Sequence, residues 1–244
     1  MVSAVSIKNL KKDYHNIRAI KDINLEIMKG DFFALLGPNG AGKSTTINIL
    51  TGLTNKTSGE VKLFGKDVVK DYREARSFIG LVPQEFNFDI FEKVYNILYY
   101  NAGYFEIPAK ERPLKIEKIL KDLGLWEKKN EQAQNLSGGM KRKLMICRAL
   151  IHDPKILILD EPTAGVDVET RKSMYQFFRR LNEGGTTILL TTHYLEEAEE
   201  LCNRIAIINK GEIIKLENKD KLLKDFGGNK KLEEIFIELT RDGV

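Results

Sequence analysis

The sequence predicts an α/β protein: a parallel β-sheet covered by helices, with an N-terminal antiparallel β subdomain and an inserted helical subdomain. Three observations lead to this fold class. Short apolar segments alternate with helical patterns along most of the chain, segments near the N terminus alternate apolar and polar residues, and a long central region contains helical patterns alone.

Four segments have the length and apolar composition of buried strands: Phe32 to Leu36, Phe78 to Val82, Ile156 to Leu159 and Thr187 to Thr191. Helical patterns separate them, so we expect the strands to run parallel, with all four carboxyl ends at one edge of the sheet. Each strand is followed there by glycine or polar residues. Ligands bind along this edge in such sheets, which makes it the expected position of a functional site.

Alternation of apolar and polar residues predicts a separate antiparallel patch packed against this sheet. It is formed by Val5 to Leu10, Ile23 to Ile27 and Val61 to Phe64.

The central region is expected to hold three helices, from Ile90 to Phe105, from Pro113 to Leu123 and from Ser137 onward. After the break at Gly227-Gly228, apolar residues recur at helical spacing, at Leu232, Ile235, Phe236 and Leu239. We therefore expect a core of residues 1–85 and 156–220, a helical subdomain of residues 86–155, and a tail helix within residues 221–244.

Composition narrows the class of protein. The 42% hydrophobic and 30% charged residues are typical of a soluble domain, and no apolar run approaches the roughly 20 residues that cross a bilayer. The start lacks the features of a secretory signal, so a cytoplasmic protein is expected. The net charge of +4 arises from 39 basic residues interspersed with 35 acidic ones, which predicts a mixed surface and no nucleic-acid partner. Cys147 and Cys202 are expected to be free thiols.

A glycine-rich motif, GxxxxGK[ST], follows the first predicted strand and precedes a predicted helix. It comprises Gly37, Pro38, Asn39, Gly40, Ala41, Gly42, Lys43 and Ser44. Backbone N–H groups of such a loop, with the helix N-terminus, bind a phosphate chain. Lys43 is expected to contact the β and γ phosphates, Ser44 to ligate Mg²⁺, and Thr45 to make a further phosphate contact. The motif predicts a nucleotide site.

Two adjacent carboxylates, Asp160 and Glu161, follow the third predicted strand and reach the same edge. Because neighbouring positions on an extended chain face opposite ways, we assign Asp160 to the metal and Glu161 to the base that polarises the attacking water. A phosphate loop with an acidic strand end occurs in kinases, GTPases, helicases and recombinases, so these two features leave the family open.

The discriminating stretch runs from Asn135 to Met140, with Ser137 as a helix N-cap and with exposed amides at Gly138 and Gly139, which together describe a second anion site. It resembles the LSGGQ signature of the ABC (ATP-binding cassette) ATPases, and the resemblance covers about residues 5–216 in the family's order. Met140 replaces the usual glutamine of the signature.

The resemblance implies a P-loop NTPase core, ATP and Mg²⁺ as cofactors, and a role for three further residues. Tyr14 would stack on adenine, Gln84 would sense Mg²⁺ and the lytic water, and His193 would contact the γ phosphate. It also implies a head-to-tail homodimer, in which Ser137, Gly138 and Gly139 of one chain close over the ATP held by Lys43 of the other. Asp167 would lie along the dimer seam.

Met140 with Lys141-Arg142, and the stretch from Pro162 to Asp167, resemble the drug, lipid and polysaccharide exporter (ABC-2 type) branch. There the permease is a separate integral membrane protein, which would place this chain on the inner face of the cell membrane. Eight aromatics between residues 86 and 105 suggest a groove that receives a permease helix, with Phe86 and Phe88 in contact. A soluble ABC ATPase that remodels a protein or nucleic-acid assembly is the alternative, and a metabolic kinase is disfavoured.

Overall fold

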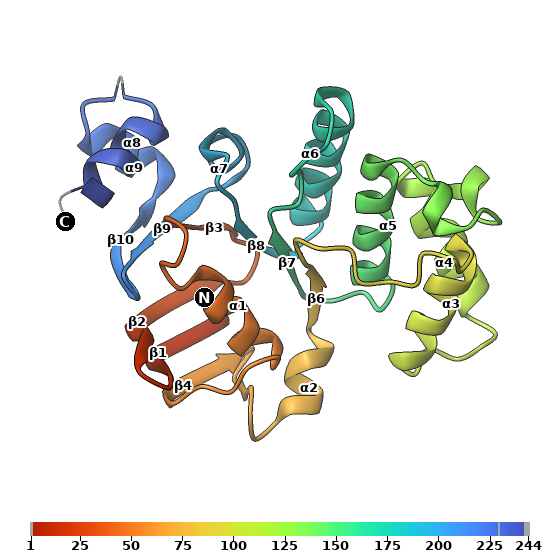
Figure 1. Cartoon of the computed structure of the whole chain (residues 1–244), viewed down its shortest axis with the longest axis horizontal. Coiled ribbons are helices and arrows are strands. Elements are labelled where there is room, and N and C mark those ends of the chain that lie inside the picture. Colours follow the sequence, from red (N-terminus) through yellow and green to blue (C-terminus); the bar gives the residue numbers. More distant parts are fainter. Residues whose placement is uncertain (1, 229, 242–244) are drawn as a thin grey trace.

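The computed structural model describes residues 2–228 and 230–241. Within them, ten strands form one sheet in the order β5-β4-β1-β2-β10-β9-β3-β8-β7-β6 (Figure 1). The strands are β1 (Ser3–Tyr14), β2 (Ile17–Met28), β3 (Phe32–Leu36), β4 (Ser58–Leu63), β5 (Lys66–Asp67), β6 (Ile79–Val82), β7 (Ile156–Asp160), β8 (Thr187–Thr191), β9 (Arg204–Asn209) and β10 (Glu212–Asn218).

The strands β9, β3, β8, β7 and β6 run parallel to one another. All five residues of β3 and of β8 are buried, as expected where helices cover both faces of a parallel sheet. The four strands predicted from their apolar composition are β3, β6, β7 and β8, and their carboxyl ends share one edge. The α/β fold class with a parallel sheet is therefore confirmed.

The predicted antiparallel patch forms from β1, β2 and β4, but it is not separate from the parallel sheet. The strands β9 and β10 form an antiparallel hairpin, and β10 pairs with β2 at Glu212 and Asp22. The turn of this hairpin has positive φ at both Lys210 (48°) and Gly211 (80°), which suits a tight two-residue connection. The sequence pattern had not predicted β9 or β10 as strands.

Helices α1 (Lys43–Thr51), α2 (Tyr72–Ser77), α6 (Val168–Glu183) and α7 (Leu195–Leu201) accompany the sheet. The central region contains α3 (Val94–Tyr104), α4 (Arg112–Asp122) and α5 (Gly138–Leu150), with short 3₁₀ turns at Trp126–Lys128 and Ala133–Asn135. Figure 1 shows α3, α4 and α5 together beyond β6, at the opposite end from β1 and β2. The first helix begins at Val94 rather than Ile90, because Lys93 is extended and bridges to Gln132.

The tail contains the predicted helix as α9 (Leu232–Arg241), preceded by α8 (Lys219–Asp225), which the sequence pattern had not predicted. Leu232 and Ile235 are fully buried, and the backbone N–H of Leu232 donates to Glu199 on α7. Residue 1 of the expected core and residues 229 and 242–244 of the expected tail lie outside the described residues. Within the described part, none of the helices combines the length and apolarity needed to cross a bilayer.

His152, in the turn between α5 and β7, gives a pH-dependent stability prediction. Its ring stacks on Phe105 with centroids 3.6 Å apart, and burial lowers the pKa of the imidazole. The folded state therefore binds a proton at His152 less tightly than the unfolded chain does. Protonation of His152 then favours the unfolded chain, so the free energy of unfolding falls as the pH falls through the range in which imidazoles take up a proton. From about pH 7 to about pH 5 we expect the free energy of unfolding to fall, and His152→Gln to reduce that fall.

Urea titrations at several pH values measure this effect. The exposed His15 provides the matched control, since His15→Gln should leave the pH dependence unchanged. A His152→Gln variant that keeps the whole pH dependence of the wild type would contradict the prediction.

Candidate active site

The glycine-rich loop between β3 and α1 is shaped by close backbone contacts. A Cβ atom at Gly37 would lie 2.3 Å from the carbonyl oxygen of Ile208 on β9, so a side chain does not fit there. Gly42 has φ of 112°, a left-handed conformation that favours glycine, and it begins α1. The first amide of this helix to bond back is that of Thr46, to the carbonyl of Gly42. The amides of Lys43, Ser44 and Thr45 therefore remain available to a ligand.

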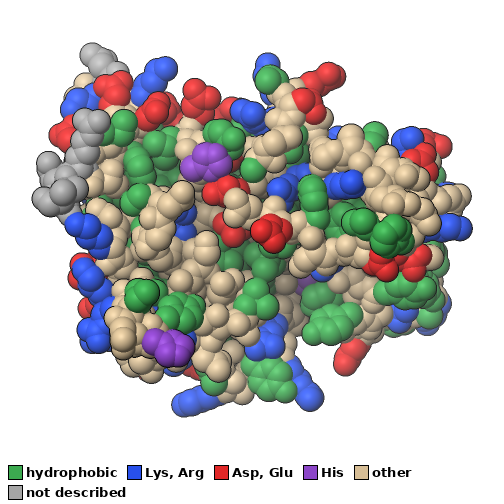
Figure 2. Space-filling view, in the orientation of Figure 1, with side chains coloured by type: hydrophobic (Ala, Val, Ile, Leu, Met, Phe, Trp, Pro, Cys, Tyr) green, Lys and Arg blue, Asp and Glu red, His purple; other side chains and the backbone are tan. Residues whose placement is uncertain are grey.

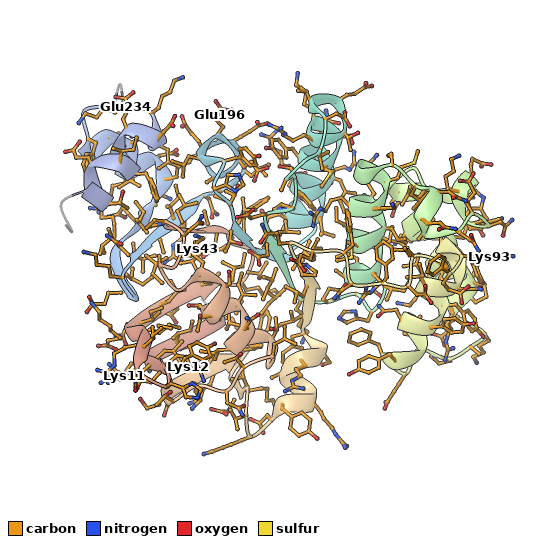
Figure 3. All side chains as sticks on the ribbon, viewed as in Figure 1. Lys11, Lys12, Lys43, Lys93, Glu196 and Glu234 are labelled. Atoms are coloured by element: carbon orange, nitrogen blue, oxygen red, sulfur yellow. The ribbon has the colours of Figure 1, made fainter. Side chains whose placement is uncertain are left out.

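Lys43 is the first residue of α1 (Figure 3). Its ammonium group donates to the carbonyls of Gly37 (2.6 Å) and Pro38 (3.1 Å), which holds the side chain over the loop. Burial lowers the pKa of Lys43, while Glu161 and Asp160 act in the opposite direction. A partly desolvated cation beside free amides suits a phosphate chain.

Asp160 and Glu161 differ in backbone conformation. Asp160 is the last residue of β7 and lies in register with Thr191 of β8, whose hydroxyl donates to its carboxylate. Burial raises the pKa of Asp160, and the charge of Glu161 adds to this effect. Glu161 has left the strand, with φ of 50°. The alternation of an extended strand therefore ends at Asp160, and both carboxylate residues line the same cavity.

Gln84 and His193 both contact one oxygen of the Glu161 carboxylate. The side-chain amide of Gln84 donates to Oε2 at 3.0 Å, and Nδ1 of His193 lies 3.2 Å from the same oxygen. These residues follow β6 and β8, on either side of β7 in the sheet. The strand order therefore brings three polar groups, far apart in the sequence, within hydrogen-bonding distance.

A cavity of about 560 Å³ joins these groups. It is lined by Ala19, Asn39, Gly40, Gly42, Lys43, Ser44, Thr45, Gln84, Asp160, Glu161 and His193. Figure 2 shows acidic side chains and a histidine gathered near the middle of this face. Among the described residues no group of three or more His, Cys, Asp or Glu side chains could hold a metal. The hydroxyl, carboxylate and amide oxygens present do fit Mg²⁺, which takes few protein ligands and completes its shell with phosphate and water.

Eight predicted nucleotide-binding residues do not line this cavity: Gly37, Pro38 and Ala41 of the loop itself, and five residues outside the loop. Ser137 caps α5, accepting from the amide of Met140 (3.3 Å), and the first turn of that helix contains the exposed Gly138 and the half-buried Gly139. Asp167 caps α6, accepting from the amide of Thr170 (2.9 Å). Tyr14 is 39% exposed at the end of β1, with the ammonium group of Lys12 4.4 Å from its ring centroid. The roles assigned to these residues stay predictions.

Sequence reasoning missed Arg142 and Thr191. The sequence analysis used Arg142 only as part of the stretch that resembles the exporter branch, whereas in the structure this residue is only 4% exposed. Its guanidinium donates to the carbonyls of Pro83 and Gln84. The helical spacing between Ser137 and Arg142 could have placed the arginine near the signature, but it could not show which loop lies against it.

The fold and the cavity define a nucleoside triphosphatase with a P-loop NTPase core. A family model described as ABC transporter matches residues 20–164, more than half of the chain. The chain is 38% identical over 237 residues to the linearmycin resistance ATP-binding protein of Bacillus subtilis, covering 97% of this chain and 75% of the relative. It is 39% identical over 214 residues to the Nod factor export ATP-binding protein I of Cupriavidus metallidurans, and the match covers 88% of this chain and 71% of the relative.

Solved structures of ATP-binding cassettes have a similar fold. An ATP-binding subunit of an ABC transporter superposes with a TM-score of 0.89 at 26% identity, covering 97% of this chain and 99% of the other. A dimeric ATP-binding cassette in a post-hydrolysis state, bound to ADP and Pi, superposes with a TM-score of 0.79 at 30% identity, covering 88% and 98%. The chain belongs to the ABC transporter family, and it is an ATP-binding and ATP-hydrolysing subunit of that family.

Proposed function

We propose that this chain powers export through a separate integral membrane permease, with two copies associating head to tail when ATP binds. The main support is that the signature turn, Ser137 to Gly139, lies outside the cavity that contains Lys43 and Glu161, with Ser137 and Gly138 exposed and Gly139 half-buried. A second copy could supply this turn, which the cavity of a single chain lacks. The names of the two curated relatives, a resistance protein and an export protein, support the direction of transport.

In the proposed mechanism Lys43 and the loop amides bind the β and γ phosphates, and Glu161 accepts a proton from the attacking water. Gln84 and His193 orient the carboxylate, since both contact its Oε2 atom. Ser44, Asp160 and Gln84 would hold Mg²⁺, which neutralises phosphate charge when bound. The signature turn of the second chain would close over the γ phosphate through its amides.

The proposed permease surface lies beside β6, where the helical region meets the core. A groove of about 340 Å³ there is lined by residues that include Leu53, Leu81, Tyr104 and Phe105. Phe86, Tyr100 and Tyr104 are exposed, whereas Phe88 packs against the core. Such an apolar groove can receive a helix of another protein. We place the chain in the cytoplasm, bound to the inner face of the cell membrane through this groove.

We also propose that residues 86–155 form a unit that moves against the core of residues 1–85 and 156–220, with residues 221–244 as the tail. This division assigns the signature turn to one unit and the phosphate loop to the other, while the groove is lined by residues of both units. Movement between the units would then change both the dimer contact and the permease contact.

Purification from native membranes in mild detergent tests the export proposal. We expect one integral membrane protein to copurify with the wild-type chain, and Tyr104→Asp to reduce its recovery about tenfold or more, because an exposed aromatic anchor is replaced by a charge. Tyr104 is 82% exposed, so folding and the ATPase rate of the isolated chain should be unchanged.

Leu114→Asp, at a 73% exposed position of α4 outside the groove, is the matched control and should leave recovery unchanged. A reproducible soluble partner with no membrane protein would contradict the proposal. So would equal loss of recovery in both variants.

A further inference from the structure

We infer that Arg142 is a positioning residue that connects the signature turn of a chain to Gln84 in the same chain. Through it, the nucleotide held by the second chain would influence the hydrolytic carboxylate of the first. This inference rests on the proposed head-to-tail dimer and goes beyond it, because it assigns to Arg142 the contact through which α5 positions Gln84.

The guanidinium of Arg142 forms hydrogen bonds with the backbone of the segment that follows β6. Nη1 donates to the carbonyl of Pro83 at 2.8 Å, and Nη2 donates to the carbonyl of Gln84 at 2.9 Å. Two parallel bonds to consecutive carbonyls fix the position and the direction of the peptide between them. The shape of this irregular segment therefore depends on α5.

A second arginine of α5 holds the same segment further along. Arg148 donates to the backbone carbonyl of Asn87 at 2.9 Å and to the side-chain oxygen of Asn87 at 2.7 Å. The Phe86 ring between these anchors lies 5.1 Å from the guanidinium carbon of Arg142. The segment is thus tied to α5 at two points, and only the first of them includes Gln84.

The burial of Arg142 is unusual for a packing residue. Its charge is removed from water, yet both of its hydrogen bonds go to neutral carbonyls, and its Nε atom has no partner among the described residues. Burial lowers the pKa of this guanidinium, and the charges of Asp160 and Glu161 act in the opposite direction. A buried cation held in this way is costly relative to an apolar residue of similar size. A role in positioning Gln84 explains its presence better than packing does.

The connection consists of three short rigid steps. Gly138 and Arg142 lie four residues apart on α5, which is about one helical turn. Arg142 binds the backbone of Gln84, and the side chain of Gln84 donates to Glu161 at 3.0 Å. When phosphate binding draws the signature turn toward the second chain, α5 moves the backbone of Gln84, and the hydrogen bond to Glu161 changes with it.

The test uses Arg142→Lys and Arg142→Met in the full-length chain. Lysine keeps the charge but cannot make two parallel bonds. We expect both variants to bind ATP as monomers within about twofold of the wild type. We expect kcat to fall about tenfold and the Hill coefficient for ATP to fall from between one and two in the wild type to one.

Lys143→Met, at the next position on α5, is the matched control and should change neither kcat nor the Hill coefficient for ATP. If Arg142→Met fails to fold, Arg142→Lys provides the test, with thermal unfolding as the check on folding. A role in packing or charge alone would be restored by lysine, so an Arg142→Lys variant with normal kcat and normal cooperativity overturns the inference. A wild-type Hill coefficient of one overturns it as well.

The trapped dimer of Glu161→Gln separates this inference from the function on which it rests. If Glu161→Gln forms no dimer with ATP, the head-to-tail proposal fails first. If that dimer forms and Arg142→Lys still hydrolyses ATP cooperatively at the wild-type rate, only the role of Arg142 is overturned.

Discussion

Glu161→Gln is expected to lower the rate of ATP hydrolysis by about 10²- to 10⁴-fold while leaving ATP binding intact, and to accumulate a dimer. Glutamine has the same shape and keeps an oxygen that can accept the hydrogen bond from Gln84, so the cavity is preserved. Its amide cannot accept the proton of the attacking water. Because Lys43 and the signature turn remain, both phosphate-binding surfaces still hold ATP. Phosphate release and size-exclusion chromatography with ATP and Mg²⁺ measure the two effects.

Glu196→Gln is the matched control for this substitution. Glu196 is exposed on α7, three residues after His193, and its side chain does not line the cavity (Figure 3). The control should hydrolyse ATP at the wild-type rate and show no trapped dimer. A Glu161→Gln protein that stays monomeric at saturating ATP, or that hydrolyses ATP normally, would refute the assignment of the base.

Ser137→Arg is expected to abolish hydrolysis and ATP-dependent dimer formation without weakening the binding of ATP to the monomer. Ser137 is exposed and does not line the cavity of its own chain, so the added bulk affects only a surface offered to a second chain. The lost N-cap costs about 1 kcal/mol of stability, which the folded protein should tolerate. Binding of a fluorescent ATP analogue and phosphate release separate the two functions.

Gln134→Arg adds the same bulk at an exposed position just outside the signature turn and should behave as the wild type. Loss of monomer binding in Ser137→Arg would place the signature in the chain's own site and contradict the proposed dimer.

Mixing two inactive variants gives a stronger test of the composite site. In a dimer of Lys43→Ala with Ser137→Arg, one site has both defects and the other has neither. Equal mixing should restore at most roughly a quarter of the wild-type rate, because half of the dimers are mixed and each holds one intact site. Coupling between the sites lowers this value further. Complete absence of restoration at every mixing ratio, with mixed dimers demonstrated by crosslinking, would mean that a single intact site does not turn over.

The edge of the sheet that carries the site could be predicted from local patterns. Short apolar segments specify strands, the helical patterns between them specify parallel pairing, and parallel strands share the direction of their carboxyl ends. The loop ending in Lys43 and the residues Gln84, Asp160 and His193 could therefore be placed at one edge from the sequence alone. The pairing of β10 with β2 could not, because it joins chain segments nearly 200 residues apart.

The sequence by itself determined the chemistry of this protein: a loop that binds phosphates, an acidic strand end, and a signature that marks the ABC transporter family. These features are local, since each depends on a few neighbouring residues and on the backbone conformation they favour. Only the tertiary structure decided that Gln84 and His193 meet at one oxygen of Glu161, and that Arg142 is buried against the backbone of Gln84. Such contacts depend on strand order and on how α5 packs beside β6, which no local pattern encodes.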